Sequence, residues 1–466
     1  MGAFHRIHRL GVILIFLLLV PGIASAHEIS GQFEAPLPLT LLFSGAAVTV
    51  GVTAFMLAFA VEEPLADAVL EPRFSISPPV AAGLRVTARG LFFLAFVLTL
   101  VTGLLARQVQ AENFATIFVW AVWLKGIALM AAITGSPWRV LSPWRALYDV
   151  LSRLERRPIA VLGDYPSWLG VGPALIGYLF WIGIIENLTV IPRSPNSTVL
   201  LLIGYTTVML VGGLLFGPEW FRKADVLSVL YRLFGRVSPV YATRTETGGY
   251  RIEFRGPWQG CTRSVYGLAV AGFVIATVYT VSFDGFTSTP EYQTILLEVQ
   301  RIFDVGPTVA VLLYLVGFLG FIAAFAVTIV LTGWLADEPS SDWRRTAFAF
   351  APTVLPIAVA YEVAHNYPFV LANAGQLPAT LWPFFGLGRE PTFDLLWWLT
   401  VSAFWWSQIV LIVAGHIVAV VAAHYVALSR YETTRKARRA HGPLVVLMIG
   451  YTVLSLWIIS RPVVTG

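Results

Sequence analysis

Long apolar stretches separated by short polar segments recur along the whole chain. After residue 26, ten of these stretches are long enough to cross a hydrocarbon core of about 30 Å as helices. The ninth is longer than a span needs, so we expect it to tilt or to project beyond the membrane. The pattern predicts an all-α polytopic bundle of about ten transmembrane helices. The ranges are 37–61, 87–106, 113–134, 168–189, 197–217, 264–283, 306–334, 347–372, 395–428 and 443–460.

The first 26 residues have the layout of a secretory signal peptide. Two arginines precede the apolar run 10–20, and Ala24 to Ala26 offer a small-residue cleavage site. Cleavage there would make His27 the first mature residue, outside the cytoplasm. The alternative is an uncleaved membrane anchor. We expect 27–466 to form a single transmembrane domain.

Basic residues are distributed unevenly between the two sets of loops. If the mature N-terminus lies outside, the inward loops hold 23 of the 31 Lys and Arg residues, and the outward loops hold five. Cytoplasmic loops carry such an excess in membrane proteins, so we expect both mature termini on the outer side of a plasma membrane. The inward loops are 62–89, 135–167, 218–263, 335–345 and 429–442.

The inward loop 218–263 carries local structure. Apolar positions over 219–237 recur on one side of a helix, which predicts an interfacial helix that faces lipid. The segments 240–245 and 250–254 alternate in polarity and are joined through two glycines, which predicts a short hairpin. We expect both to be cytoplasmic elements at the membrane surface.

A doubled motif marks the inward loop before it. The sequence Ser-Pro-Trp-Arg occupies 136–139 and recurs at 142–145, ahead of an Arg-rich amphipathic stretch that ends at Arg157. A tryptophan ring and an arginine are both satisfied in the headgroup layer. We therefore expect this segment, with its tryptophans, to lie at the membrane–water boundary.

Composition agrees with lipid as the solvent for much of the surface. Of 466 residues, 57% are hydrophobic and only 12% are charged, against about 25% charged in an average soluble domain. The net charge of +5 is spread over loops, so we expect no nucleic acid partner. The expected partners are the lipid bilayer and a small hydrophobic substrate or metal ion. Cys261 is the only cysteine, which excludes an intramolecular disulfide and any cysteine-rich metal site.

Ionisable residues inside the predicted spans are costly in lipid, so each is a candidate functional residue. Glu362 and His365 are three apart in the eighth span, and both therefore project from one helix face. Glu-x-x-His is the spacing that delivers a carboxylate and an imidazole to one metal ion, which makes the two residues candidate catalytic groups. The alternative is a buried hydrogen-bonded pair. The full set is Lys125, Glu186, Glu362, His365, His416 and His424, with Gln408 and Tyr361 as polar neighbours.

Lys125 lies near the middle of the third span, where an unpaired ammonium would be costly. We expect Glu362 to be its partner, with Glu186 as the second choice. Such an ion pair would make the Glu362 carboxylate less available to a metal ion.

A mature N-terminal His27 would offer both an α-amine and an imidazole, a natural chelate for copper. A divalent ion, copper or zinc, is therefore predicted on His27, Glu362 and His365, with His416 and His424 as further candidate ligands. Joining His365 to His416 requires a kink in the eighth helix or a large tilt, since the two residues differ in depth. The alternative is that His27 is an ordinary post-cleavage residue.

Several motifs resemble one known family. They are SPWRVLSPWRAL (136–147), YPSWLGVGPALI (165–176), EWFRKADVLSV (219–229), FDGFT (283–287), the Ala-His pairs that end at His27, His365 and His424, and the Gly-His pair that ends at His416. In wording and order they are similar to prokaryotic membrane proteins described as fenitrothion hydrolase-like. The resemblance covers nearly the whole chain, and it implies hydrolysis of organophosphate triesters.

Three functions follow as hypotheses. The first is a metal-dependent phosphotriester hydrolase, in which a metal held by Glu362 and His365 activates a water molecule. The second is a metal or small-solute transporter, because the intramembrane polar groups occupy successive depths. The third is a structural membrane subunit, in which those groups only fix helix packing.

Overall fold

The computed structural model describes residues 38–60, 74–387 and 391–461. Within these ranges, ten helical segments are long and apolar enough to cross a membrane, which confirms the predicted number. The predicted signal peptide and His27 lie outside the described residues. The chain is thus a multi-pass, all-α integral membrane protein.

Seven spans are single helices, in which runs of Leu, Val, Phe and Ala satisfy their backbone hydrogen bonds internally, as lipid demands. They are α2 (Leu39–Ala60), α3 (Pro78–Leu105), α9 (Pro195–Phe216), α12 (Leu268–Thr287), α14 (Val309–Leu335), α17 (Val401–Arg430) and α18 (Thr434–Ile459).

The other three spans change their helix type along their length. The third consists of α4 (Phe114–Thr116), the π-helix η2 (Ile117–Gly126) and α5 (Ile127–Thr134). The fourth consists of η3 (Ser167–Leu169), α8 (Gly172–Tyr178) and the π-helix η4 (Leu179–Glu186). The eighth consists of α15 (Trp343–Phe350), the 3₁₀ turn η8 (Ala351–Val354) and α16 (Leu355–Leu381).

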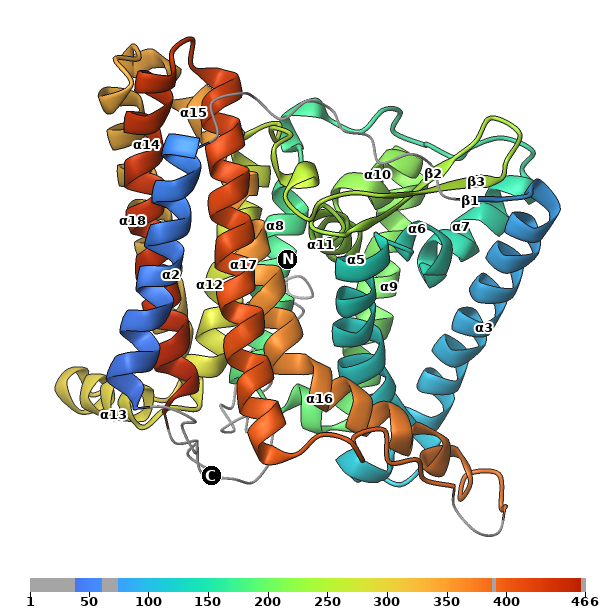
Figure 1. Cartoon of the computed structure of the whole chain (residues 1–466). Helices are drawn as coiled ribbons and strands as arrows, with labels where there is room; N and C mark the ends of the chain where they lie inside the picture. Colours follow the sequence, from blue (N-terminus) through green and yellow to red (C-terminus); the bar gives the residue numbers. More distant parts are fainter. Residues whose placement is uncertain (1–37, 61–73, 388–390, 462–466) are drawn as a thin grey trace, which may run out of the picture.

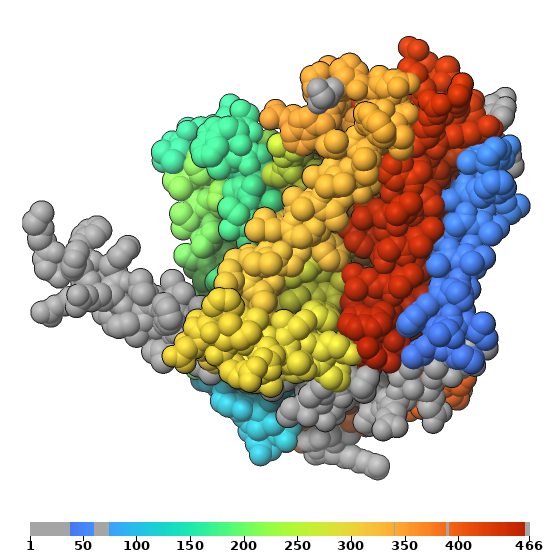
Figure 2. Space-filling view, turned by 90° about the vertical axis from the view of Figure 1, so that its left-hand side faces the viewer, coloured from blue at the N-terminus to red at the C-terminus, as the bar shows by residue number. Residues whose placement is uncertain are grey.

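The spans form two groups joined through α16. In Figure 1, α2, α14, α17 and α18 stand together on the left, whereas α3, α5 and α9 stand on the right. The helix α16 packs against α17 on one side and against η2 on the other. Figure 2 shows α14 running obliquely beside α18, with α2 on the far side of α18.

A three-stranded antiparallel sheet lies at one end of the bundle (Figure 1). The strands β2 (Val240–Arg244) and β3 (Tyr250–Phe254) confirm the predicted hairpin. The strand β1 (Phe74–Ile76), which was not predicted, pairs with the other edge of β3 and places Phe74 opposite Ile252. We call this end the sheet end.

The opposite end carries α13 (Pro290–Phe303), an amphipathic helix that lies between two spans and was not predicted. Its apolar residues alternate with Glu and Arg, so it is too polar for the hydropathy criterion that finds membrane spans. We call this end the α13 end.

The predicted interfacial helix over 219–237 is two helices, and the second faces protein instead of lipid. α10 (Pro218–Lys223) ends just before Asp225, whose carboxylate caps α11 (Val226–Phe234) by accepting a hydrogen bond from the Leu227 amide. Seven of the nine residues of α11 are buried inside the protein. An apolar helix face has the same sequence pattern whether lipid or protein covers it, which is why the prediction was wrong.

The tryptophans of the doubled Ser-Pro-Trp-Arg motif are also covered by protein and do not face the headgroups, contrary to the prediction from the sequence. Trp138 is the first residue of α6 (Trp138–Leu141), and Trp144 is the second residue of α7 (Pro143–Leu154). They are 1% and 0% exposed. Both indole N–H groups donate to the Asp225 Oδ2, over 2.8 and 3.1 Å. Burial raises the pKa of Asp225, although these bonds favour its charged form. The motif therefore anchors α6 and α7 to the start of α11.

Candidate functional site

A cavity of about 530 Å³ extends into the bundle from the α13 end, between η2, η4, α12, α16 and α17. This is the size of pocket that accepts a small organic molecule. Five acidic or basic side chains line it: Glu186, Arg193, Asp284, His365 and Arg461. Most of the remaining wall is apolar or aromatic and includes Trp120, Phe369, Phe404, Trp405 and Ile458.

Lys125 forms the centre of a buried ion cluster beside this cavity. Its Nζ lies 2.9 Å from Glu186 Oε1 and 3.4 Å from Glu362 Oε1. All three side chains are nearly excluded from the surface, with exposed fractions of 7 to 12%. Both carboxylates proposed from the sequence therefore contact Lys125, and Glu186 is the nearer one. One ammonium between two carboxylates leaves the cluster with a negative formal charge when all three are ionised.

Lys125 and Glu186, the closer ion pair of the cluster, each come from a π-helix. Lys125 lies in the last turn of η2, and Glu186 is the last residue of η4. A π-helix has a wider turn than an α-helix and often occurs at functional sites, because it re-aims the side chains that follow. Here the change in helix type points a charged side chain from each of two spans at the same place.

His365 and Asp284 form a second polar pair, in the wall of the cavity. His365 Nε2 lies 3.6 Å from Asp284 Oδ2, and the side chains are 25% and 17% exposed. Both line the cavity, so both can meet water or a ligand. The carboxylate is placed to stabilise a positive charge on the imidazole.

Glu362 and His365 lie one turn apart on α16, as predicted, but they contact different partners. Glu362 contacts Lys125, whereas His365 contacts Asp284 and the cavity. Asp284 was missed because the predicted sixth span stopped at residue 283. The FDGFT motif that includes Asp284 was the signal in the sequence that could have identified it.

A proline opens the helix next to His365. Pro368 lies inside α16 and has no amide hydrogen, so the carbonyl of Ala364 four residues earlier loses its helical donor. The Gln408 side chain of α17 donates a hydrogen bond to that carbonyl. Gln408 therefore replaces the hydrogen bond that the Ala364 carbonyl loses to Pro368. Lipid could not supply such a donor.

Tyr361 contributes a buried hydroxyl to the same cavity. The residue is 3% exposed, and its hydroxyl makes no hydrogen bond to the described part of the chain. It lies against Gly285, where a Cβ atom would overlap the hydroxyl. Because Gly285 has no side chain, the Tyr361 hydroxyl can lie beside it, close to Asp284 and His365.

The two histidines of α17 lie apart from this site. His416 is 1% exposed, and its Nδ1 lies 2.8 Å from the Ile412 carbonyl of its own helix. His424, two turns further along α17, packs against His441 of α18 with ring centroids 5.3 Å apart. Neither residue lines the cavity.

The predicted metal ligands do not form one group among the described residues. In that part of the chain, no three His, Cys, Asp or Glu side chains are arranged closely enough to hold a metal ion. His27, the remaining predicted ligand, lies outside the described ranges. Copper or zinc binding stays a prediction that depends on His27, and elemental analysis of the purified protein would test it.

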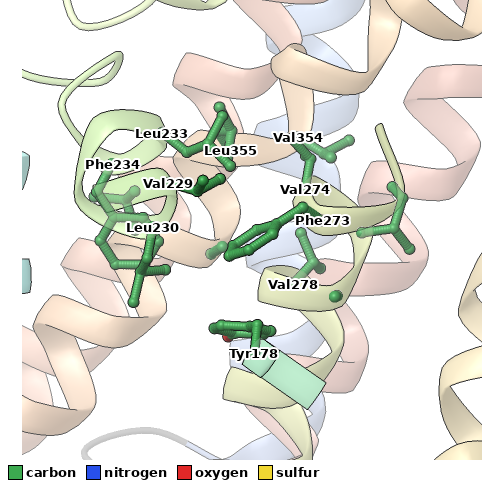
Figure 3. Packing of buried hydrophobic residues seen from close by; sticks show 14 of the residues in the cluster. Tyr178, Val229, Leu230, Leu233, Phe234, Phe273, Val274, Val278, Val354 and Leu355 are labelled. Atoms are coloured by element: carbon green, nitrogen blue, oxygen red, sulfur yellow. The ribbon is translucent and has the colours of Figure 1, made fainter. Parts of the chain in front are cut away.

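Tightly packed apolar side chains separate the ion cluster from the sheet end. A small chamber of about 20 Å³ borders Lys125 and Glu362, and Leu230 and Phe234 of α11 also line it. Figure 3 shows these two side chains facing Phe273, with further buried residues packed around them. The cavity is therefore reached from the α13 end and closed toward the sheet end by α11 and its neighbours. The other labelled side chains in the figure are Tyr178, Val229, Leu233, Val274, Val278, Val354 and Leu355.

No protein family, curated protein or solved structure matches this chain. The resemblance to fenitrothion hydrolase-like proteins therefore stays a prediction from the sequence. The observations establish a polytopic membrane protein of ten candidate spans, with a cavity of about 530 Å³ among its described residues.

Proposed function

We propose that the protein binds a small, largely apolar ester in the cavity and hydrolyses it there. The observation that carries this proposal is the pair of His365 and Asp284 at 3.6 Å, both of which line the open cavity beside several aromatic side chains. The resemblance of the motifs suggests a phosphotriester as the substrate class.

In the proposed reaction, His365 acts as the general base, and Asp284 and Tyr361 assist it. His365 accepts a proton from a water molecule while the oxygen of that water attacks the phosphorus or acyl carbon of the ester. Asp284 stabilises the imidazolium that forms, and the imidazolium then returns the proton to the leaving group. The Tyr361 hydroxyl is available to donate a hydrogen bond to the oxygen that gains negative charge.

The orientation of the cavity suits such a substrate. The sheet end carries most of the basic residues, so the positive-inside rule assigns it to the cytoplasm and the α13 end to the outer side. An apolar ester would then enter from outside the cell, without crossing the packed core below the ion cluster.

Turnover in lipid nanodiscs tests the proposal, with a panel of chromogenic phosphotriesters and carboxylic esters. We expect His365→Gln to lower kcat/KM by about 10²- to 10⁴-fold, as loss of a general base does, and Asp284→Asn to lower it as well. His424→Gln is the matched control, because His424 is outside the cavity lining. Equal turnover by wild type and His365→Gln, or no turnover of any ester, would contradict the proposal.

The Lys125 cluster supports a second candidate, a proton-coupled transporter. Buried carboxylates around one ammonium can exchange protons, and such groups mark transport pathways in membranes. This function requires the packing around Phe273 to open toward the sheet end. Ligand-driven pH change inside proteoliposomes, lost in Glu186→Gln, would support transport over hydrolysis.

A further inference from the structure

In each copy of the Ser-Pro-Trp-Arg motif, the tryptophan is buried in the protein and the arginine that follows it lies nearer the surface. Trp138 and Trp144 point inward to Asp225, as described above. Each is followed directly by an arginine, and these side chains lie nearer the surface: Arg139 is exposed and Arg145 is half-buried. The repeat thus uses its tryptophans as anchors and presents its two arginines together.

A third arginine joins them from the neighbouring span. Arg89 of α3 donates a hydrogen bond to the Val140 carbonyl over 3.2 Å, which fixes it next to α6. Its Nη1 also lies 2.9 Å from Asp149 of α7. Burial lowers the pKa of Arg145, and the charges of Arg139 and Arg89 lower it further, as expected for guanidinium groups held close together.

Among the residues that the structure describes, these three arginines outnumber the acids that act on Arg145. Asp149 is the one carboxylate that raises the pKa of Arg145, and its ion pair is with Arg89. Within the described part of the chain, the Arg145 guanidinium makes no hydrogen bond or ion pair of its own. The cluster therefore keeps a surplus of positive charge and unused donors that suit an oxyanion.

The cluster lies at the depth of the lipid headgroups. Arg89 comes just before the uncharged apolar run 91–105 of α3, and the third span ends at Thr134, shortly before Arg139. Figure 1 shows α6 and α7 beside α3 at the sheet end. An anion at this level and on this side would be a phospholipid phosphate at the inner leaflet.

We propose that Arg89, Arg139 and Arg145 bind the phosphate of an anionic phospholipid. Three guanidinium groups can share the phosphate oxygens, and the lipid chains would lie along the apolar surface of α3. The site is separate from the cavity, so the proposal does not depend on hydrolysis.

Lipid titration of the purified full-length protein in a neutral detergent tests this site. Phosphatidylglycerol should raise the unfolding temperature of the wild type in a saturable way, and phosphatidylcholine should not. Each of Arg139→Gln and Arg145→Gln should weaken this effect about fivefold, and the double variant about 25-fold. Arg145→Lys should retain part of the affinity, because it keeps the charge but not the planar fork.

Arg157→Gln is the matched control, because Arg157 lies beyond the end of α7 and pairs with Glu155. Selective loss in the Arg139 and Arg145 variants, with normal unfolding in phosphatidylcholine, would support the proposal. An equal response of all variants to phosphatidylglycerol would overturn it. An equal rise produced by inorganic phosphate alone would also overturn it, in favour of a site for free anions.

Discussion

At the residue scale, a polar residue can be recognised from the sequence as a candidate functional residue when it lies well inside an apolar span. Lys125, Glu186 and Glu362 stand out because charges are rare in apolar spans, and their need for partners predicts the cluster. Asp284 could not be found this way, because it lies at the end of an apolar run where water is also an option. The partner of His365 was therefore missed, although His365 itself was found.

Removing the ammonium from the ion cluster should destabilise the protein strongly. Lys125→Met leaves two carboxylates buried without their cation, and loss of one partner from a buried pair costs about 3–5 kcal/mol in the free energy of unfolding. Adding Glu186→Gln and Glu362→Gln should recover part of that loss. Unfolding in detergent measures both. A cost below about 1 kcal/mol for Lys125→Met would show that the cluster is already neutral without the lysine.

The single cysteine should be inert in the folded protein. Cys261 is 0% exposed, and burial raises the pKa of its thiol to about 12. At pH 8 only about one thiol in ten thousand would then be the reactive thiolate. We expect maleimide to label Cys261 only after denaturation, and to label an added exposed cysteine, Thr247→Cys, at once. Rapid labelling of the folded wild type would contradict the burial.

At the element scale, hydrophobic pattern predicts where helices and the hairpin occur but not what covers them. The ten spans and the β2–β3 hairpin were predicted correctly, because the length of an apolar stretch and the period of its apolar positions can be counted in the sequence. The π-helices were not, because a shift from i−4 to i−5 hydrogen bonds leaves the apolar pattern unchanged. For α11, burial depends on the Asp225 network, which joins segments about 80 residues apart.

Close packing between α16 and α17 should depend on one glycine. A Cβ at Gly415 would overlap the Ala360 side chain and approach the Pro356 carbonyl. We expect Gly415→Ala to lower the free energy of unfolding by about 1–3 kcal/mol, as overpacking does. Gly450→Ala on α18 is the control, because its Cβ would meet open space. Equal stability of the two variants would show that α16 and α17 can separate without cost.

At the scale of the whole molecule, the bundle is open toward the α13 end and closely packed toward the sheet end. The cavity reaches Glu186, Asp284 and His365 from the α13 end, and the packing around Phe273 and α11 closes the other side. The arrangement follows from sequence features that lie far apart, and so composition alone could not predict it. It also shows how charged groups are tolerated at this depth: Lys125 and Glu362 are paired, and Glu186, Asp284 and His365 line the open cavity.

Thiol accessibility in intact cells tests this one-sided cavity most directly, because it needs no substrate. In the wild-type background, Ala372→Cys places a thiol on the cavity wall, and Leu230→Cys places one within the packed core. We expect a small, membrane-impermeant cationic methanethiosulfonate added outside the cells to modify Ala372→Cys and to leave Leu230→Cys and Cys261 unmodified. Modification of Ala372→Cys only from the cytoplasmic side, or of Leu230→Cys from either side, would contradict a cavity that opens outward and ends at the ion cluster.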